Sequence, residues 1–257
     1  MNRIAFSIFA INVYWYSICI LLGIVIAYSL IAYEAKKHGI SKDVVSDLMF
    51  YTILIGIVGA RIYYVIFNLN YYLKNPIEIL KIYNGGLAIH GGILFGLIFV
   101  YFYTKKKKFN FIRILDIVSP ALIIAQAVGR WGNFFNQEAY GREVTLQTLQ
   151  GFHIPDFIIK GMKINGSYYY PCFLYESLLC LIGFIIIMLI RKKKNIKLGT
   201  QIGFYFIWYG ITRFFIEASR QDSLMLFNLK MAQIISIIGI VIGMMLIIRK
   251  SGKYYEE

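Results

Sequence analysis

Long apolar runs alternate with short polar segments along the whole chain. Seven of these runs have about 17 to 23 residues, the length that a helix needs to cross the hydrocarbon core of a bilayer. They cover residues 13–33, 46–68, 84–104, 111–130, 171–190, 199–219 and 231–248. The pattern predicts an all-α polytopic membrane protein with about seven transmembrane helices.

The longest stretch outside these runs is residues 131–170. It contains Gly151, Pro155 and Gly161, which are residue types that favour turns. We therefore predict a single integral-membrane domain over residues 1–257, with 131–170 as a small cap on the outer side.

A second segment between the runs carries a helix-start signal. Asn75 and Pro76 are followed by Glu78, which is typical of a helix cap, a first-turn proline and a capping-box acid. In a helix the apolar residues of this segment would share one face, so we predict that it lies in the outer membrane interface. These apolar residues are Ile77, Ile79, Leu80 and Tyr83.

The composition agrees with a membrane protein rather than a soluble one. Hydrophobic residues make up 59% of the chain and aromatic residues 17%, and the mean hydropathy is +0.64. The net charge of +14 would suit a nucleic-acid partner if the basic residues formed one soluble face, but they occur in short clusters between apolar runs. We therefore expect membrane lipids, and no nucleic acid, as partners.

The basic clusters also predict the orientation. Of the 27 Lys and Arg residues, 16 lie in the segments after the first, third, fifth and seventh runs, and 8 lie on the opposite side. An excess of Lys and Arg marks the cytoplasmic side of a membrane protein. The N-terminus is therefore predicted outside and the C-terminus in the cytoplasm. The predicted cytoplasmic clusters include Lys194 and Lys250.

This orientation places the embedded polar residues at a common depth. Six of the seven runs carry polar groups in or at the end of their outer half. Ionisable residues are costly there unless they are paired or face water, so their shared depth indicates a functional cavity. The residues concerned are Tyr16, Arg61, His90, Arg130, Asn133, Asn136, Glu138, Tyr175, Glu176, Arg213 and Glu217.

All three embedded basic positions are arginines, which favours planar, bidentate recognition of a phosphate or a carboxylate. In the outer half of a membrane, the abundant phosphate belongs to phospholipid headgroups. Some pairing inside the cluster is expected, because Arg213 and Glu217 are one helical turn apart. A buried salt-bridge network with a purely structural role is the alternative.

His90 is the best proton acceptor of the cluster at neutral pH, although a lone histidine is more often a hydrogen-bonded structural group. Neither of the other two histidines lies at metal-ligand spacing from His90, and no two cysteines lie at such a spacing from each other. We therefore expect no metal and no cofactor. Gly91 and Gly92 follow His90, and they allow either close backbone approach in a site or tight helix packing.

The polar stretch after the fourth run resembles a family signature. Residues 129–141 read Gly-Arg-x-Gly-Asn-Phe-x-Asn-x-Glu-x-x-Gly, as in bacterial prolipoprotein diacylglyceryl transferases. Residues 170–176 read Tyr-Pro-Cys-Phe-Leu-Tyr-Glu, where the family usually has Pro-Ser-Gln-Leu-Tyr-Glu, and Ile93 replaces a leucine. Other similar pieces are Trp15-Tyr16, Gly59-Ala60-Arg61, His90-Gly91-Gly92, Leu174-Tyr175-Glu176, and Tyr209-Gly210 with Arg213, Glu217 and Arg220.

The resemblance implies an enzyme of lipoprotein maturation. It would transfer the sn-1,2-diacylglyceryl group from phosphatidylglycerol to the lipobox cysteine thiol that follows a preprolipoprotein signal peptide, forming a thioether and releasing glycerol phosphate. The implied location is the bacterial plasma (inner) membrane, with the active site open to the outer leaflet. The arginines suit this reaction, because they can hold the phosphate as its bond to carbon breaks.

Our hypothesis for the catalytic residues names His90, Arg130 and Arg213. His90 would deprotonate the thiol or position the thiolate, and the two arginines would hold the phosphate. Alternatively, the thiol ionises against the arginines alone. The expected substrate-binding residues are Tyr16, Arg61, Arg130, Asn133, Asn136, Glu138, Gly141, Glu217 and Arg220.

A phospholipid or small-anion transporter would be a different use of the same arginines. Transporters often place their site near the midplane between repeated halves, whereas this cluster lies towards one face of a chain without internal repeats. A structural membrane scaffold fits poorly with so many embedded charges. We therefore favour the enzyme.

Overall fold

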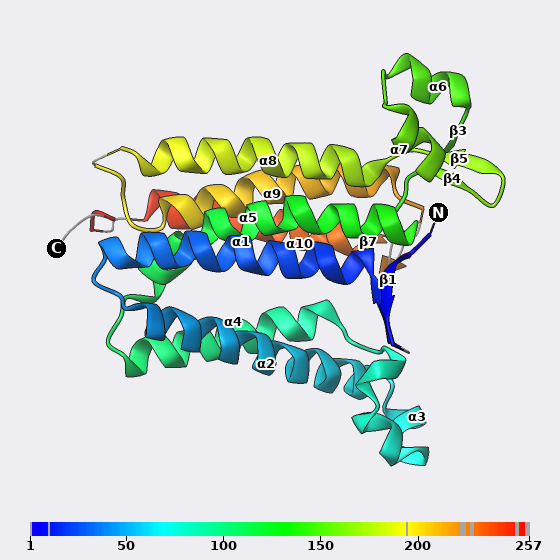
Figure 1. The fold of residues 1–257 in the computed structure, drawn as a ribbon. Helices are drawn as coiled ribbons and strands as arrows, with labels where there is room; N and C mark the ends of the chain where they lie inside the picture. Colours follow the sequence, from blue (N-terminus) through cyan, green and yellow to red (C-terminus); the bar gives the residue numbers. More distant parts are fainter. Residues whose placement is uncertain are drawn as a thin grey trace. The chain divides into compact units, whose positions relative to one another are not determined.

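The structure is a computed structural model that describes residues 2–9, 11–193, 195–221, 225–226, 229–249 and 252–254 (Figure 1). It divides into two compact units, each of which is described by itself. Unit 1 comprises Met1–Ile31 and Leu115–Glu257, and unit 2 comprises Ala32–Ile114. Lys194 and Lys250 of the predicted cytoplasmic clusters lie outside the described residues.

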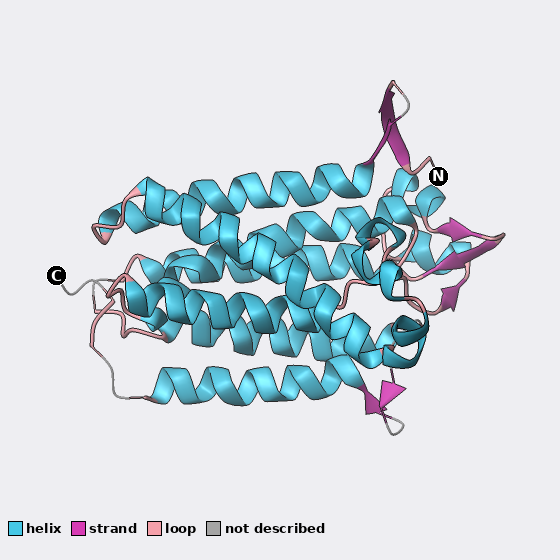
Figure 2. Ribbon diagram, turned by 90° about the horizontal axis from the view of Figure 1, so that it is seen from below, coloured by secondary structure: helices cyan, strands magenta, loops and turns pink. Residues whose placement is uncertain are grey.

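Unit 1 contains the first part of α1, most of α5, and the helices α8, α9 and α10. The long helices are α1 (Trp15–Lys37), α5 (Phe111–Asn136), α8 (Cys172–Arg191), α9 (Thr200–Ser219) and α10 (Met231–Ile248), and the short ones are α6 (Leu146–Gly151) and α7 (Asp156–Gly161). The strands are β1 (Ile4–Ile8), β2 (Ile11–Tyr14), β3 (Glu143–Val144), β4 (Lys163–Ile164), β5 (Ser167–Tyr169), β6 (Met225–Leu226) and β7 (Leu229–Lys230). These strands lie at the end of the unit where α1 begins (Figures 1 and 2).

Unit 2 is built on two long helices, α2 (Lys42–Phe67) and α4 (Ile89–Lys106). Between them lie α3 (Leu69–Lys74) and the 3-10 helices η1 (Pro76–Leu80) and η2 (Ile82–Asn84).

Each of the seven predicted runs coincides with one long helix. By length and composition, five of these helices, α1, α2, α5, α8 and α10, are able to cross a membrane. The prediction of a mostly helical, polytopic membrane protein is confirmed at this level. The count of seven spans and the orientation stay predictions.

The fourth helix extends beyond its predicted end. The predicted run stops at residue 130, whereas α5 continues to Asn136. Its last turns keep an apolar face, since Phe134 is 3% exposed and its ring stacks on that of Phe173 at 4.7 Å between centroids. Arg130 and Asn133 therefore lie on a helix, one turn apart, rather than at the start of a loop.

The predicted cap segment, residues 131–170, contains a small sheet as well as short helices. Strands β3, β5 and β4 pair antiparallel in that order. Strands of two or three residues are too short to show an alternating sequence pattern, so the all-α prediction holds for the long elements only. The core of the cap, which includes the end of α5 and the start of α8, consists of Phe134, Leu149, Ile154, Ile158, Ile159, Met162 and Phe173.

Glycines let α2 and α4 pack closely in unit 2. A Cβ atom on Gly59 would lie 2.9 Å from the carbonyl oxygen of Gly91, and one on Gly92 would lie 3.3 Å from that of Gly56. Of the two interpretations of Gly91 and Gly92, the structure therefore favours tight helix packing. Helices α9 and α10 of unit 1 also meet through glycines.

The predicted helix start at Asn75 is partly right. The 3-10 helix Pro76–Leu80 follows it, but the side chain of Asn75 makes no cap hydrogen bond to this helix and instead donates to the carbonyl of Tyr71 at 3.2 Å. Glu78 pairs with Lys81 at 2.6 Å, so the predicted capping box is wrong. The apolar residues Ile77, Leu80 and Tyr83 are 72%, 82% and 79% exposed. Their place in the membrane interface stays a prediction.

A buried polar network joins α5, α8 and α9 near the start of α5. The carboxylate of Asp116 accepts hydrogen bonds from the backbone N–H groups of Gly199 at 2.6 Å and Ile202 at 2.8 Å, which caps α9. Arg191 on α8 donates to the carbonyl of Asp116 at 2.7 Å and to the side chain of Gln201 at 2.5 Å. These bonds fix the three helices to one another at the end remote from Arg130.

Candidate active site

Arg130, near the end of α5, contacts the two neighbouring helices. Its Nη2 lies 2.7 Å from Oε1 of Glu176 on α8 and donates to the hydroxyl of Tyr209 on α9 at 3.0 Å. Its Nη1 donates to Oδ1 of Asn133 at 3.3 Å. An arginine has five N–H donors, so the Nε–H and one Nη1–H of Arg130 have no partner among the described residues.

Glu176 links Arg130 to a second arginine. Its Oε2 accepts from Nη1 of Arg213 at 3.1 Å, and its Oε1 also accepts from the hydroxyl of Tyr209 at 3.3 Å. The side chain of Glu176 is 3% exposed, compared with 20% for Arg130 and 15% for Arg213. The carboxylate therefore lies on the buried side of the two arginines.

The last turns of α9 carry a second acidic partner. Nη2 of Arg213 lies 2.5 Å from Oε2 of Glu217, which confirms the predicted pairing, and Nη1 of Arg220 lies 3.9 Å from the same oxygen. Lys230 closes this end of the helix, because its Nζ donates to the carbonyls of Glu217 at 2.6 Å, Ala218 at 3.1 Å and Arg220 at 2.9 Å.

Among the described residues, the directly linked charged groups leave an excess of positive charge. Arg130, Arg213 and Arg220 contact two carboxylates there, Glu176 and Glu217, so these five groups together have a net charge of +1 when ionised. Within the described residues, no group of three or more His, Cys, Asp or Glu side chains could hold a metal ion. The chemistry of this cluster is the binding of an anion, and the arginine fork suits a phosphate.

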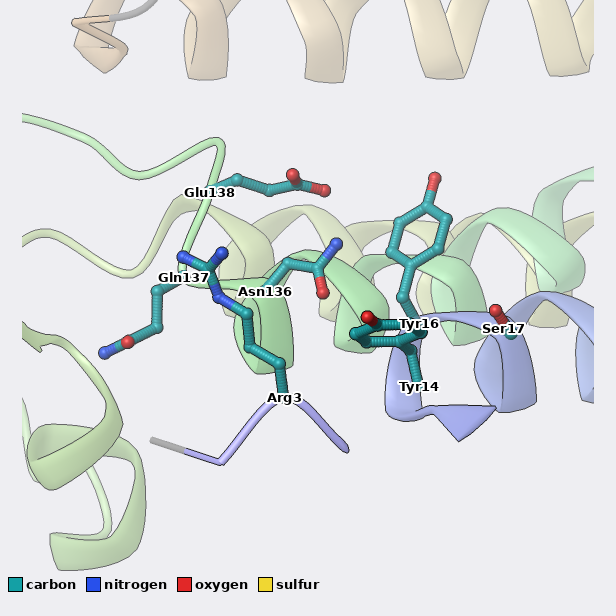
Figure 3. A pocket seen from close by; sticks show the side chains of 7 residues that line it. All are labelled: Arg3, Tyr14, Tyr16, Ser17, Asn136, Gln137 and Glu138. Carbon is teal, nitrogen blue, oxygen red and sulfur yellow. The ribbon is translucent and has the colours of Figure 1, made fainter. Parts of the chain in front are cut away.

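A pocket of about 400 Å³ lies between the start of α1 and the residues that follow Asn133 (Figure 3). Nδ2 of Asn133 donates to Oε1 of Glu138 at 2.9 Å, and Glu138 lines the pocket. The hydrogen bonds from Arg130 through Asn133 to Glu138 thus connect the arginines with the pocket. The other lining residues are Arg3, Tyr14, Tyr16, Ser17, Asn136 and Gln137. Three of the predicted substrate-binding residues therefore line one pocket.

The pocket lining carries one positive and one negative group, Arg3 and Glu138, and its other residues contribute amides, hydroxyls and the rings of Tyr14 and Tyr16. In Figure 3 the Arg3 side chain points towards the turn that carries Gln137 and Glu138. Such a lining suits a neutral ligand with several hydroxyl or amide groups. Gly132 brings Tyr16 close to α5, because a Cβ atom at Gly132 would lie 2.8 Å from Cδ2 of the Tyr16 ring.

Gly141 brings the loop after α5 against the end of α9. Its N–H donates to the carbonyl of Tyr170 at 2.9 Å, and it forms an antiparallel bridge with Arg220. A Cβ atom at this position would lie 2.9 Å from Sγ of Cys172 and 3.2 Å from the carbonyl oxygen of Ser219. The geometry gives Gly141 a packing role next to Arg220, and its role in substrate binding stays a prediction.

The segment that departs from the family pattern packs α8 against the cap. The Tyr170 ring stacks on that of Tyr175 at 4.9 Å between centroids, and Phe173 belongs to the cap core. Burial, followed by the neighbouring Tyr175, raises the pKa of the Tyr170 hydroxyl above its usual range. Cys172 is buried, with its Sγ packed against Gly141. All three positions therefore have structural contacts.

Two predicted site residues belong to unit 2. Arg61 is 7% exposed and uses four of its N–H groups on backbone carbonyls, so it holds the segment between α3 and α4 in place. Its acceptors are Ile79, Gly85 and Gly86, each at 2.9 Å, and Glu78 at 2.5 Å. His90 lies in the first turn of α4, with its ring 6.3 Å from that of Tyr63. Their roles beside the residues of unit 1 stay predictions.

The residues of this site outside the set predicted to be catalytic or substrate-binding include Glu176, Tyr209, Lys230 and the pocket residues Arg3, Tyr14, Ser17 and Gln137. Glu176 carries a sequence signal, because it is the only acid in the fifth run, and Tyr209 lies one helical turn before Arg213. No sequence signal marks Lys230 or Arg3, because the groups around them come from other segments of the chain.

Comparisons with known proteins agree with the resemblance. A family model described as prolipoprotein diacylglyceryl transferase matches residues 3–249. Curated relatives named phosphatidylglycerol--prolipoprotein diacylglyceryl transferase, from Staphylococcus aureus strains MSSA476, MW2 and Newman, are each 47% identical to this chain over 255 residues. The matched region covers 99% of this chain and 91% of each relative.

Proposed function

The chain belongs to the prolipoprotein diacylglyceryl transferase family, and we propose that its arginine cluster is the centre of the transfer reaction. The chain is a transferase that moves a diacylglyceryl group from phosphatidylglycerol to a prolipoprotein. The observation that carries our assignment of the site is the bridge between Arg130 and Arg213, two arginines from different helices that share the carboxylate of Glu176.

In the proposed reaction, the acceptor is the lipobox cysteine thiol that follows the signal peptide of a preprolipoprotein. Its sulfur attacks the glyceryl carbon that carries the phosphate, in the sn-1,2-diacylglyceryl part of the lipid. A carbon–sulfur thioether bond forms while the carbon–oxygen bond breaks, and the electron pair of that bond leaves with glycerol phosphate. The thiol proton passes to a base or to water.

Arg130 and Arg213 act on the leaving group. Negative charge grows on the phosphate as the carbon–oxygen bond breaks, and donors that already point at this position stabilise the charge without reorganisation. Both arginines are held by carboxylates and still have N–H groups without a partner in the described part of the chain. This supports a role in binding the phosphate.

The remaining residues of unit 1 bind the headgroup or orient the arginines. The pocket takes the terminal glycerol of phosphatidylglycerol, a neutral diol, through Tyr16, Asn136 and Glu138. The groups that orient the arginines are Asn133 at Arg130, and Glu217 and Arg220 at the end of α9, which the loop at Gly141 approaches.

In unit 2, His90 accepts the thiol proton or positions the thiolate, and Arg61 orders a segment that contributes to substrate binding. The alternative for the proton is that the thiol ionises beside the arginines without a dedicated base.

All seven long helices span the membrane in this proposal, including α4 and α9. Helix α4 has 18 residues, which is enough for a span, and α9 carries the polar residues that face the site. The distribution of basic residues supports an outer N-terminus and a cytoplasmic C-terminus. The site then opens to the outer leaflet of the bacterial plasma membrane.

The experiment is a transfer assay with the purified full chain in phosphatidylglycerol vesicles and a lipobox peptide. We expect a thioether-linked lipopeptide and released glycerol phosphate, and no product from a peptide whose acceptor cysteine is replaced by alanine. Arg130→Ala should lower the rate by about 100-fold or more. Movement of lipid without peptide modification would favour a transporter, and near-normal transfer by Arg130→Ala would refute the assigned site. Near-normal transfer by His90→Gln would remove the base role.

A further inference from the structure

Glu176 contacts both Arg130 and Arg213, the two arginines assigned to the phosphate. Arg130 comes from α5 and Arg213 from α9, and each takes one oxygen of the carboxylate, at 2.7 Å and 3.1 Å. Tyr209 adds a hydrogen bond to each of Glu176 and Arg130. A carboxylate from a third helix thus sets the separation of two like charges.

Each arginine has other partners that would remain without this carboxylate. Arg130 would keep Asn133 and Tyr209, and Arg213 would keep Glu217. What would be lost is the group that offsets the repulsion between the two guanidinium ions. The specific contribution of Glu176 is therefore the relative placement of the arginines, more than the presence of either one.

The carboxylate of this arrangement is more deeply buried than the two arginines. Glu176 is 3% exposed, whereas Arg130 and Arg213 keep 20% and 15% of their side chains exposed. A guanidinium is planar and rigid, so fixing Nη2 of Arg130 and Nη1 of Arg213 on the buried side also fixes where their other N–H groups point. Because both arginines stay partly exposed while the carboxylate is buried, an anion can reach each of them without displacing Glu176.

We propose that Glu176 is a positioning residue for diacylglyceryl transfer, which holds Arg130 and Arg213 as one pair for the phosphate leaving group. This inference rests on the proposed function of the cluster. Glu176 itself touches neither the phosphate nor the thiol. Its effect is on the rate of the step in which charge grows on the phosphate, because that step depends most on the exact placement of donors.

The position of Glu176 is itself well anchored. It lies in the first turns of α8, where Phe173 packs in the cap core and the Tyr175 ring stacks on that of Tyr170 at 4.9 Å between centroids. Aspartate at position 176 would keep the charge but would be shorter by one carbon–carbon bond, about 1.5 Å. We expect it to reach one arginine and not both.

The test compares Glu176→Gln, Glu176→Asp and the matched control Ser177→Ala. The control removes a buried hydrogen bond, from Ser177 to the carbonyl of Ala127 at 2.9 Å, that involves neither Glu176 nor an arginine. Each full-length variant is purified into phosphatidylglycerol vesicles, and kcat and KM are measured with a lipobox peptide. We expect Glu176→Gln to lower kcat by about 10- to 100-fold and to change KM by less than about threefold. Glu176→Asp should be intermediate, and Ser177→Ala should stay within about twofold of the unmodified protein.

A second measurement separates positioning from folding. If Glu176 acts through the arginines, Glu176→Gln should have little further effect on kcat in an Arg213→Lys background, because that pair is already disrupted. Additive losses would overturn the proposal, as would a folded Glu176→Gln variant with the kcat of Ser177→Ala. If Glu176→Gln does not fold, a folded Glu176→Asp variant with the unmodified kcat would overturn it. Absence of transfer by the unmodified protein would instead refute the proposed function.

Discussion

Replacing Gly141 by alanine tests whether close backbone packing sets the position of the end of α9. The added methyl carbon would lie 2.9 Å from both Sγ of Cys172 and Cβ of Tyr170, and 3.2 Å from the carbonyl oxygen of Ser219. The Cβ and the carbonyl oxygen cannot move away by a rotamer change, so the backbone must shift. Overpacking of this kind costs about 1–3 kcal/mol. For a chain of this size, that corresponds to about 2–12 °C in unfolding temperature.

The bridge between Gly141 and Arg220 would move with this shift. We therefore expect Gly141→Ala to lower the transfer rate even at a temperature where the protein is fully folded. Unfolding can be followed with a thiol-reactive fluorescent dye, because the thiols of Cys19, Cys172 and Cys180 are all buried. Transfer is measured separately, well below the unfolding temperature.

Gly151→Ala is the matched control. Gly151 ends α6, and a Cβ atom there would have no atom within 4 Å, so alanine should be neutral or stabilising by about 0.4–1 kcal/mol. If Gly141→Ala shows the unfolding temperature and transfer rate of this control, the reasoning from close packing is refuted.

Two further predictions concern other parts of unit 1. Arg3→Ala removes the positive group of the pocket lining and should raise KM for phosphatidylglycerol by about five- to tenfold with little change in kcat. Initial rates measure both constants, and Arg3→Lys should have a smaller effect on KM. An unchanged KM in Arg3→Ala would contradict the pocket assignment. Asp116→Asn should lower the unfolding temperature, because an amide cannot accept the hydrogen bonds of both Gly199 and Ile202, a loss of about 1–3 kcal/mol. KM should not change, since Asp116 is about 21 Å from Arg130 along α5, and a clear KM effect would refute this structural role.

Local sequence patterns were sufficient for the long helices and for one ion pair. The length of an apolar run and the rise of a helix are local quantities, so all seven predicted runs coincide with helices. Arg213 and Glu217 are four residues apart on one helix, and their pairing follows from that spacing alone. Even here α5 extends beyond its predicted end, because Phe134 finds its stacking partner, Phe173, on another element.

The sequence patterns were less informative where partners come from distant segments. Glu176 meets Arg213 across 37 positions of the chain, and no helical spacing connects the two. Asn75 and Glu78 carry the capping-box pattern, but the neighbouring groups Tyr71 and Lys81 take their side chains instead. The short strands of the cap form through pairing between segments, which a stretch of two or three residues does not reveal.

By itself, the sequence determined the helical membrane class, the family signature at residues 129–141, and the gathering of polar residues towards one end of several helices. The tertiary structure decided which of these groups meet: it placed Glu176 between Arg130 and Arg213 and gave Gly141 its contacts beside Arg220. The physical reason is that hydrophobicity and helical rise add up residue by residue. Contacts between helices depend on how each helix is rotated and how closely it packs, and only the folded chain specifies that.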